Sequence, residues 1–300
     1  MAQTQQFERV GDGLLVRAPG KVNLSLLIAG KRPDGFHELE TVMAKIDLCD
    51  ELLIQHGRKD GIELLCQGQH WAPEGPENLV YRAAQEVFQL CGKTHDVRLT
   101  LTKHIPAGSG LGGASSDAAA VLMGLNEYLG LGLSHTQLAG IAARLGSDIA
   151  FFLNGPLALC TGRGEKITAI QTRFIFVALL LLPDVNVSTK AVYASYRHDP
   201  QRFAQLSRQV GAFLEKNRVD LVATMCANML TGSCFSLFKE LGNLKGAVES
   251  LGVGPVCLSG SGSALFCIVR ESDSENPENW RDRIASETGC RCAVVRNNGW

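Results

Sequence analysis

The segment from Pro106 to Asp117 holds the residues best suited to bind a phosphate group. Its sequence is PAGSGLGGASSD, with four glycines within six residues. Glycine has no Cβ atom and adopts positive φ freely, so a ligand can come close to the backbone N–H groups. Ser115, Ser116 and Asp117 are typical helix-start residues, and apolar residues follow them at helical spacing. We therefore expect free backbone amides at the positive end of a helix, an arrangement that binds phosphate.

Two common phosphate-binding motifs do not match this segment fully. Gly108, Gly110 and Gly113 match the G-x-G-x-x-G pattern of dinucleotide-binding proteins, but the acidic residue expected about 20 residues later is missing. The Walker pattern needs Gly-Lys-Ser or Gly-Lys-Thr, and no lysine lies between Ala107 and Asp117. A connecting turn without function also contains glycines, and the segment alone leaves that alternative open. If phosphate binds here, the cation that serves it must come from elsewhere in the chain.

Lys21 and Asp148 could carry out phosphoryl transfer beside such a loop. Lys21 lies on the polar face of an alternating segment, and Asp148 follows a glycine that ends a predicted helix. A carboxylate can orient a hydroxyl group and accept its proton, while an ammonium group offsets developing negative charge. Each residue also has a structural alternative: a half-buried edge strand for Lys21, and a helix cap for Asp148.

A third glycine-rich segment, LSGSGSA at 258–264, lies between two predicted strands. Taken alone, it is better explained as a flexible hairpin turn.

Composition narrows the class of partner. The chain has 300 residues, of which 45% are hydrophobic and 20% charged, as in a globular protein of one large or two moderate domains. With 29 basic and 30 acidic residues the net charge is -1, which favours neither nucleic acid nor a membrane and points to a small molecule. The first residues do not resemble a secretory signal, and we expect a cytoplasmic protein.

The ten cysteines include no C-x-x-C pair, and several lie in apolar runs, among them Cys257 and Cys267. We expect reduced thiols that pack as small hydrophobic groups. Cys290 and Cys292 could form a metal or redox pair, but two residues on one face of a strand are the simpler interpretation.

The order of predicted elements favours an α+β fold over a regular βαβ repeat. In the first half, strands are predicted over residues 14–17, 21–29, 41–46, 51–55, 62–65, 97–102, 157–161 and 167–170, and helices over 79–90, 116–129 and 136–145. In the second half, strands are predicted over 174–182, 256–259, 264–269 and 290–295, and helices over 190–196, 201–215, 220–227, 234–241 and 243–251. We place the boundary near Gln171, which gives an N-terminal domain of residues 1–171 and a C-terminal domain of residues 172–300.

Together, three segments resemble the three motifs of the GHMP kinase superfamily in order and spacing. They are PGKVNL at 19–24, the segment from Pro106 to Ser116, and LSGSG at 258–262. The resemblance extends from about Ala18 to Val269. It implies a two-domain architecture with an N-terminal unit like ribosomal protein S5 domain 2 and a C-terminal ferredoxin-like unit. It also implies an ATP-dependent small-molecule kinase that uses Mg²⁺ and acts as a monomer or weak homodimer.

The resemblance also implies roles for individual residues. Lys21 and Asp148 match the catalytic pair. The residues that match the ATP phosphate binder are Pro106, Gly108, Ser109, Gly110, Gly112, Gly113, Ala114, Ser115 and Ser116.

Two further segments, RPDGFHEL at 32–39 and LGSDI at 145–149, indicate a branch of the superfamily whose substrate carries a cytidine diphosphate group and leads to isoprenoid precursors. By this resemblance, His37 hydrogen-bonds the cytosine, and Phe36 and Tyr193 flank it. Asn23 and Thr189 make polar contacts with the substrate. Without the resemblance, His37 would be read as a turn or surface residue and Phe36 as a core residue.

The chain departs from the family pattern at three positions: Ser109 and Ala114 replace glycines, and Met43 replaces an aromatic residue. Neither the metal ligands nor the cation that meets the γ-phosphate can be assigned, and residues 1–13 and 271–300 have no match.

Three alternatives for the function stay open. They are another kinase of the superfamily acting on mevalonate, homoserine or a sugar, a non-catalytic sensor with the same fold, and a dinucleotide-binding oxidoreductase.

Overall fold

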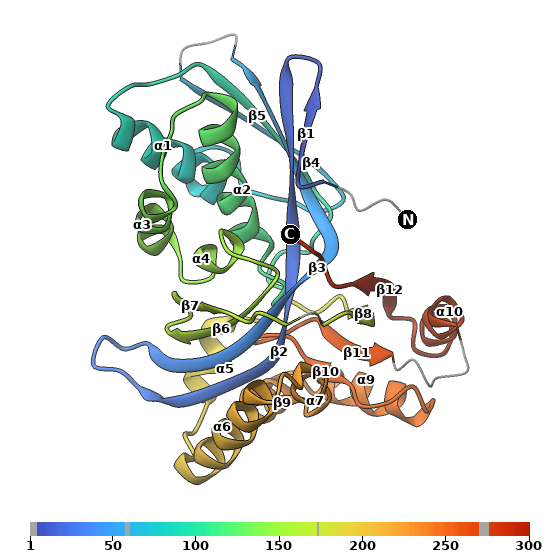
Figure 1. Ribbon diagram of the computed structural model, residues 1–300. Helices are drawn as coiled ribbons and strands as arrows, with labels where there is room; N and C mark the ends of the chain where they lie inside the picture. The colour runs from blue at the N-terminus through green and yellow to red at the C-terminus, as the bar shows by residue number, and fades with distance from the viewer. Residues whose placement is uncertain (1–4, 58–60, 173, 270–275) are drawn as a thin grey trace.

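Two long antiparallel strands, β2 (Gly13–Lys31) and β3 (His37–His56), run through both parts of the molecule (Figure 1). The computed structural model describes residues 5–57, 61–172, 174–269 and 276–300. The sequence predicted two strands within each of β2 and β3. The chain remains paired across the expected gaps, with shifts in register between Pro19 and Lys21 and between Asn23 and Ser25. These irregularities interrupt the simple alternation of faces that the sequence analysis assumed.

The first sheet is mixed, with the order β1-β2-β3-β5-β4, and β6, β7 and β9 join it at the far ends of β2 and β3. Its other strands are β1 (Phe7–Val10), β4 (Ile62–Gly68), β5 (Val97–Lys103), β6 (Leu157–Gly162) and β7 (Lys166–Ala169). The helices of this half are α1 (Leu79–Cys91), α2 (Gly113–Tyr128), α3 (His135–Leu145) and the short α4 (Ile149–Phe152), preceded by a 3₁₀ turn at Gly75–Glu77. They gather on one side of the sheet (Figure 1), and α2 packs against β2 and β3.

The second sheet is antiparallel, with the order β10-β11-β8-β12. Its strands are β8 (Val177–Leu182), β10 (Cys257–Leu258), β11 (Leu265–Val269) and β12 (Arg291–Arg296). The helices of this half are α5 (Thr189–Ser195), α6 (Pro200–Glu215), α7 (Val219–Thr224), α8 (Thr231–Leu237), α9 (Lys239–Ser250) and α10 (Pro277–Thr288). A β-α-β-β-α-β succession with this strand order is ferredoxin-like. The α+β class is therefore confirmed, and this half has the topology that the resemblance implied.

The two halves share secondary structure. A two-residue strand from the second half, β9 (Ala227–Asn228), pairs in parallel with Ser25 and Leu26 of β2, and Asn297 forms a bridge to Ile46 of β3. The predicted boundary at residues 171 and 172 falls between β7 and β8, and it stays a prediction. The sequence analysis missed β1, β9, α4 and α10. Three of these, β1, β9 and α4, have at most four residues and are too short to show a period, and α10 buries only Trp280 and Ile284.

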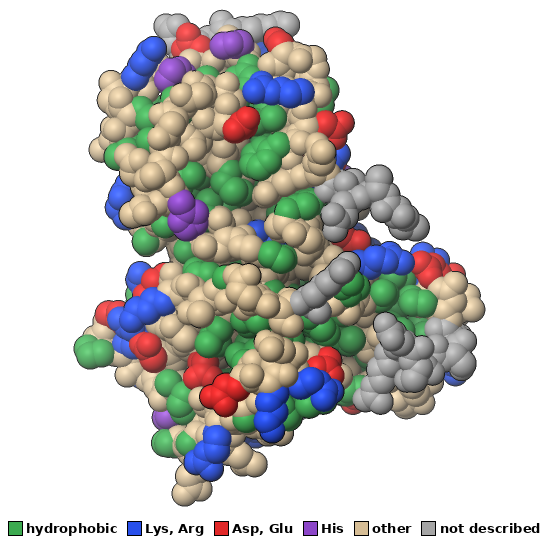
Figure 2. Space-filling view, viewed as in Figure 1, with side chains coloured by type: hydrophobic (Ala, Val, Ile, Leu, Met, Phe, Trp, Pro, Cys, Tyr) green, Lys and Arg blue, Asp and Glu red, His purple; other side chains and the backbone are tan. Residues whose placement is uncertain are grey.

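The surface agrees with the near-neutral net charge. On the face shown in Figure 2, acidic and basic side chains are interspersed. Within the described ranges, no helix is long and apolar enough to cross a bilayer.

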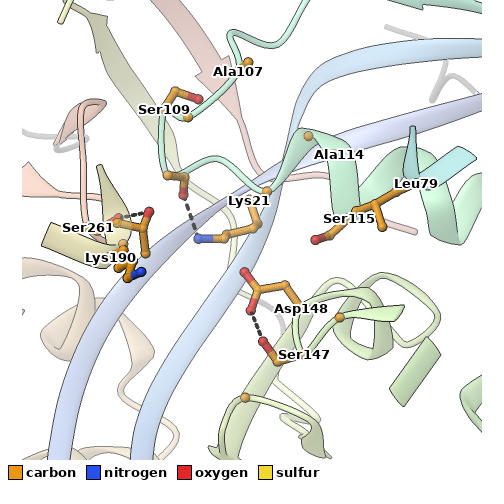
Figure 3. Close-up of a pocket in the computed structure, with 18 of the residues that line it drawn as sticks. Lys21, Leu79, Ala107, Ser109, Ala114, Ser115, Ser147, Asp148, Lys190 and Ser261 are labelled. Atoms are coloured by element: carbon orange, nitrogen blue, oxygen red, sulfur yellow. Dashed lines mark hydrogen bonds between the residues drawn. The ribbon is translucent and has the colours of Figure 1, made fainter. Parts of the chain in front are cut away.

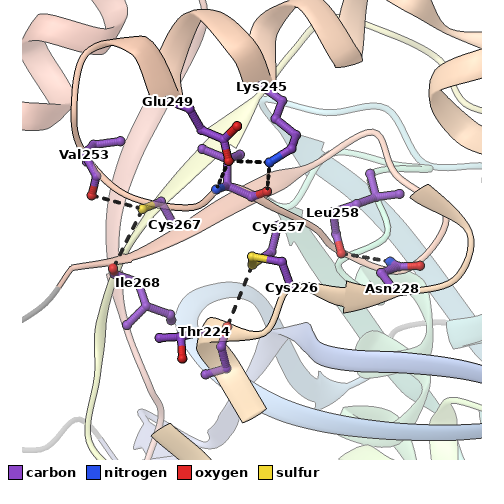
Figure 4. Close-up of a disulfide and its surroundings, with 12 residues drawn as sticks. Thr224, Cys226, Asn228, Lys245, Glu249, Val253, Cys257, Leu258, Cys267 and Ile268 are labelled. Carbon is purple, nitrogen blue, oxygen red and sulfur yellow. Dashed lines mark hydrogen bonds and ion pairs between the residues drawn. A yellow bond between two sulfur atoms is a disulfide. The ribbon is translucent and has the colours of Figure 1, made fainter. Parts of the chain in front are cut away.

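The expectation of ten reduced thiols is wrong for one pair. Cys226 and Cys257 form a disulfide with a Cα–Cα distance of 4.9 Å, which links the residue before β9 to β10 (Figure 4). Their separation of 31 residues follows no recognisable spacing, so the sequence could not reveal the pairing. The other eight cysteines keep their thiol groups. Cys292 lies in β12 and Cys290 directly precedes it, which agrees with the strand interpretation of this pair.

Candidate active site

The loop from His104 to Gly112 joins β5 to α2, and its glycines adopt the backbone conformations that a phosphate loop needs. Gly108, Gly110 and Gly112 have φ values of 67°, 78° and 73°. Helix α2 begins at Gly113 with Gly112 as its N-cap, so the prediction that Ser115, Ser116 and Asp117 start the helix is wrong. Because Gly112 has no side chain to cap the first-turn amides, these donors remain available to a ligand.

The turn at 258–264 packs directly on this loop. The Ser259 hydroxyl donates to the carbonyl oxygen of Gly110 over 3.1 Å, and the Ala264 amide donates to that of Ser109 over 2.9 Å. A Cβ atom on Gly110 would lie 2.2 Å from the carbonyl oxygen of Ser259. The segment does form a hairpin turn between β10 and β11, and it also fixes the phosphate loop.

Lys21 is buried, with 3% of its surface exposed, on a strand that is paired on both sides. The edge-strand alternative is therefore wrong. Its ammonium group donates to the Gly110 carbonyl oxygen and to Asn23 Oδ1, both over 2.6 Å. Within the described ranges these are its two hydrogen-bond partners, so the third N–H of the ammonium can meet a ligand. Burial lowers the pKa of Lys21, and the negative charge of Asp148 acts in the opposite direction.

Asp148 lies immediately before α4 and points toward Lys21 from the opposite wall of the cavity (Figure 3). It occupies the N-cap position, but within the described residues its side chain makes no capping hydrogen bond. Its Oδ1 atom lies 3.5 Å from the hydroxyl of Ser147. In the described part of the chain, Lys21 and Asp148 form no direct ion pair. The carboxylate is therefore free to receive a proton from a ligand placed between them.

These groups line one cavity of about 1210 Å³. The cavity is lined by every predicted site residue except one: Lys21, Asn23, Phe36, His37, Pro106, Gly108, Ser109, Gly110, Gly112, Gly113, Ala114, Ser115, Asp148, Thr189 and Tyr193. Ser116 is the exception, since it is 1% exposed and faces the protein interior. The individual roles of these residues stay predictions.

Aromatic side chains gather at one end of the cavity. The His37 ring lies 5.2 Å from the ring of Tyr193 and 6.0 Å from that of Tyr196, measured between centroids. Phe36 is 55% exposed, which rules out a core role, and the Arg163 guanidinium lies 5.2 Å from its ring centre. Burial lowers the pKa of His37, which favours the neutral imidazole. The sequence analysis missed Tyr196 and Arg163, which lie outside the three motifs.

A buried charge cluster lies next to the phosphate loop, where Asp50 Oδ2 is 3.3 Å from the Cβ position of Gly113. Lys103 donates to Asp117 Oδ2 over 2.6 Å and also to Asp50, whose other oxygen accepts the Ile105 amide over 2.8 Å. Burial would lower the pKa of Lys103, but the charges of Asp117 and Asp50 outweigh it and raise the pKa. Burial and the charge of Asp50 raise the pKa of Asp117.

This cluster was not predicted. Asp117 was expected to start a helix, and instead it forms part of an ion pair inside α2. Lys103 and Asp50 lie on different strands and share no motif with it. Three further residues that the sequence analysis did not select also line the cavity, namely Trp71, Asn78 and Leu79. Among the described residues, no group of three or more His, Cys, Asp or Glu side chains could hold a metal ion.

Known proteins agree with this arrangement. The model of the GHMP kinase N-terminal domain matches residues 78–156, and that of the GHMP kinase C-terminal domain matches residues 192–286. This chain belongs to the GHMP kinase family. The expected enzyme class, an ATP-dependent small-molecule kinase, is thereby confirmed, and the dinucleotide-binding alternative is wrong.

Relatives named 4-diphosphocytidyl-2-C-methyl-D-erythritol kinase match nearly the whole chain. The protein from Citrifermentans bemidjiense is 37% identical over 94% of this chain and 98% of its own length. That from Geobacillus thermodenitrificans is 38% identical over 87% and 89%.

Two solved structures align about equally well with this chain but differ in their sequence identity to it. A crystal structure of 4-(cytidine 5'-diphospho)-2C-methyl-D-erythritol kinase aligns with a TM-score of 0.75 and 33% identity, covering 95% of this chain and 100% of that chain. A homoserine kinase from Cytophaga hutchinsonii aligns with a TM-score of 0.77 at only 18% identity, covering 99% and 98%. The two TM-scores are similar, but the identity to the homoserine kinase is only 18%. The likeness to that protein therefore concerns the fold alone.

Proposed function

We propose that this protein transfers the γ-phosphoryl group of ATP to the 2-hydroxyl of 4-diphosphocytidyl-2-C-methyl-D-erythritol, in the methylerythritol phosphate route to isoprenoid precursors. The observation that carries the proposal is the placement of Lys21 and Asp148 on facing walls of a cavity that also contains the phosphate loop. The identity of 33% to 38% with kinases of that name supports the choice of substrate.

The reaction needs one proton acceptor and one fixed positive charge. The substrate oxygen forms a bond to the γ-phosphorus while the bond to the β–γ bridging oxygen breaks, and ADP leaves. Asp148 orients the hydroxyl group and takes its proton. Lys21, held in place by Gly110 and Asn23, offers its remaining N–H to the transferring group. Because the transition state is loose, positioning contributes more than the basicity of the carboxylate.

Different parts of the cavity suit the cytosine of the substrate and the adenine of ATP. The aromatic group of Phe36, His37, Tyr193 and Tyr196 offers flat surfaces and one polar ring, which can hold cytosine by stacking and by a hydrogen bond. The adenine of ATP would lie beyond the phosphate loop, against the part of the cavity wall that includes Leu79. The reacting groups then meet between Lys21 and Asp148.

The oxygen atoms near the phosphate loop fit Mg²⁺. Ser115 lines the cavity in the first turn of α2, and in the described part of the chain Asp117 Oδ1 is buried without a hydrogen-bond partner. Mg²⁺ takes most of its ligands from phosphates and water, so one or two protein oxygens suffice. When bound, the ion would neutralise charge on the phosphates of ATP. The cytoplasmic location and the monomer or weak homodimer expected from the sequence remain predictions.

Replacing Asp148 by asparagine tests the assigned chemistry. The amide keeps the size of the side chain and can still orient the hydroxyl group, but it cannot accept the proton. We expect kcat of Asp148→Asn to fall by about 10²–10⁴-fold while the affinity for ATP stays within about twofold. ADP release is followed with the cytidine-bearing substrate, and ATP binding is measured by calorimetry. Equal turnover by the two proteins would refute the role of Asp148, and nucleotide binding without turnover in the wild type would indicate a sensor.

A further inference from the structure

Lys45 is a buried lysine that the proposed chemistry does not use. It lies on β3 directly opposite Lys21 in the strand register, and only 1% of its surface is exposed. Within the described ranges it forms no ion pair. Burying an ammonium group without a carboxylate is costly, so its surroundings must satisfy its donors in another way.

The partners of Lys45 are backbone carbonyl groups at the end of α4. Its Nζ atom donates to the oxygen of Phe152 over 3.1 Å and to that of Asn154 over 2.6 Å. It also lies 5.9 Å from the centre of the Phe151 ring. A second side chain holds the same end of the helix, because Asn154 Nδ2 donates to the oxygen of Ala150 over 2.7 Å.

Helix α4 needs such anchors because it has only four residues. A single turn of helix is not stable by itself, and the surrounding protein must hold it in place. Phe151 and Phe152 are fully buried and fix one side of the turn, while Lys45 ties the carbonyl group of its last residue, Phe152, to β3. Asp148 is the residue immediately before this turn, so a shift of α4 also shifts the carboxylate.

We infer that Lys45 is a positioning residue for the phosphoryl-transfer reaction, one that holds the Asp148 carboxylate in place by anchoring α4 to the strand that pairs with Lys21. The inference rests on the proposed function. Lys45 is not among the residues that line the cavity, and it acts through the backbone from behind the site.

The first test is kinetic. Lys45→Met keeps the length of the side chain and removes its donors. We expect kcat to fall by about 10–100-fold, because small misplacements of a reacting group have effects of this size. KM for ATP and for the cytidine-bearing substrate should stay within about twofold. An unchanged kcat would overturn the inference.

A double-mutant cycle separates positioning from a general structural role. If Lys45 acts through Asp148, the variant Lys45→Met/Asp148→Ala, which lacks the positioned group altogether, should be no slower than Asp148→Ala alone, within about twofold. If the two losses multiply instead, Lys45 does not act through Asp148 and the inference is wrong.

Hydrogen exchange gives a readout that does not depend on activity. The amides of residues 149–154 should exchange at least about tenfold faster in Lys45→Met than in the wild type, while global unfolding stays cooperative. Ile54→Val is the matched control, since it removes a buried methyl group farther along β3 and should leave these amides unchanged. If Lys45→Met does not fold, Asn154→Ala removes the other anchor and should raise exchange in the same segment.

These measurements also separate the two proposals. A protein without phosphoryl transfer would refute the proposed function and, with it, the catalytic significance of Lys45, even if the exchange of α4 responds as expected. A working kinase whose α4 amides are unaffected in both variants would refute only the inference about Lys45.

Discussion

At the scale of single residues, the chemical type of a side chain was more informative than its expected exposure. Phosphoryl transfer to an alcohol needs an ammonium group and a carboxylate; this requirement predicts Lys21 and Asp148, and both line the cavity. The alternating pattern around Lys21 suggested a half-buried strand, yet both faces of β2 are covered here. Lys45 and Lys103 could not be predicted, because their partners lie on other elements and only the folded chain brings them together.

Gly110 is the glycine of the phosphate loop that tolerates a side chain least. Its φ is 78°, and a Cβ atom would overlap the carbonyl oxygen of Ser259. Gly108 has a similar φ of 67°, but the nearest atom to its Cβ position is Asn186 Oδ1 at 3.7 Å. We expect Gly108→Ala to lower the free energy of unfolding by about 1 kcal/mol, and Gly110→Ala to lower it by at least about 3 kcal/mol.

Urea unfolding of the two variants and the wild type measures this difference. Because the two substitutions share the same change in backbone freedom, any excess in Gly110→Ala reports the contact with the turn at 258–264. Equal losses would show that this contact does not constrain the loop.

At the scale of elements, the sequence predicted most helices and strands that have a clear period, and it missed those that the rest of the protein holds in place. Helices α1, α2 and α3 lie where apolar spacing placed them, although α2 begins three residues earlier than expected. The short elements α4 and β9 have too few residues to show a period. Both touch the site, since α4 follows Asp148 and β9 pairs with the strand that carries Lys21.

The anchoring of α4 by Lys45 predicts a pH dependence of stability. Burial lowers the pKa of Lys45 from 10.5 to about 8. Between these values the unfolded chain holds a proton that the folded chain has released, so the free energy of unfolding rises as the pH rises. The wild type should gain about 2 kcal/mol relative to Lys45→Met between pH about 7.5 and about 9.5.

Urea unfolding at these two pH values, on both proteins, tests the prediction. Other groups titrate equally in the two proteins, so the difference between them isolates Lys45. A difference that is independent of pH, or one that falls as the pH rises, would contradict the assigned direction of the pKa shift.

At the scale of the whole molecule, the site depends on both halves of the chain. The first half supplies Lys21, Asp148 and the phosphate loop, and the second supplies Thr189, Tyr193 and the turn at 258–264. Each of the three motifs is weak evidence by itself. Their order along the chain predicted that segments from both halves form one site. It could not predict that β9 and the disulfide would tie the turn to β2, since neither leaves a pattern in the sequence. The fold also occurs in a homoserine kinase, so the shape of the molecule does not choose the substrate.

The most direct measurement is therefore one of substrate choice. Initial rates of ADP release are compared for 4-diphosphocytidyl-2-C-methyl-D-erythritol, mevalonate and homoserine at equal concentrations, with the wild type and with His37→Ala. We predict that the wild type uses the cytidine-bearing substrate at least about 100-fold better than the others, and that His37→Ala lowers kcat/KM for it by about tenfold or more. A wild type that uses mevalonate or homoserine equally well, or a specificity that His37→Ala leaves unchanged, would contradict this account.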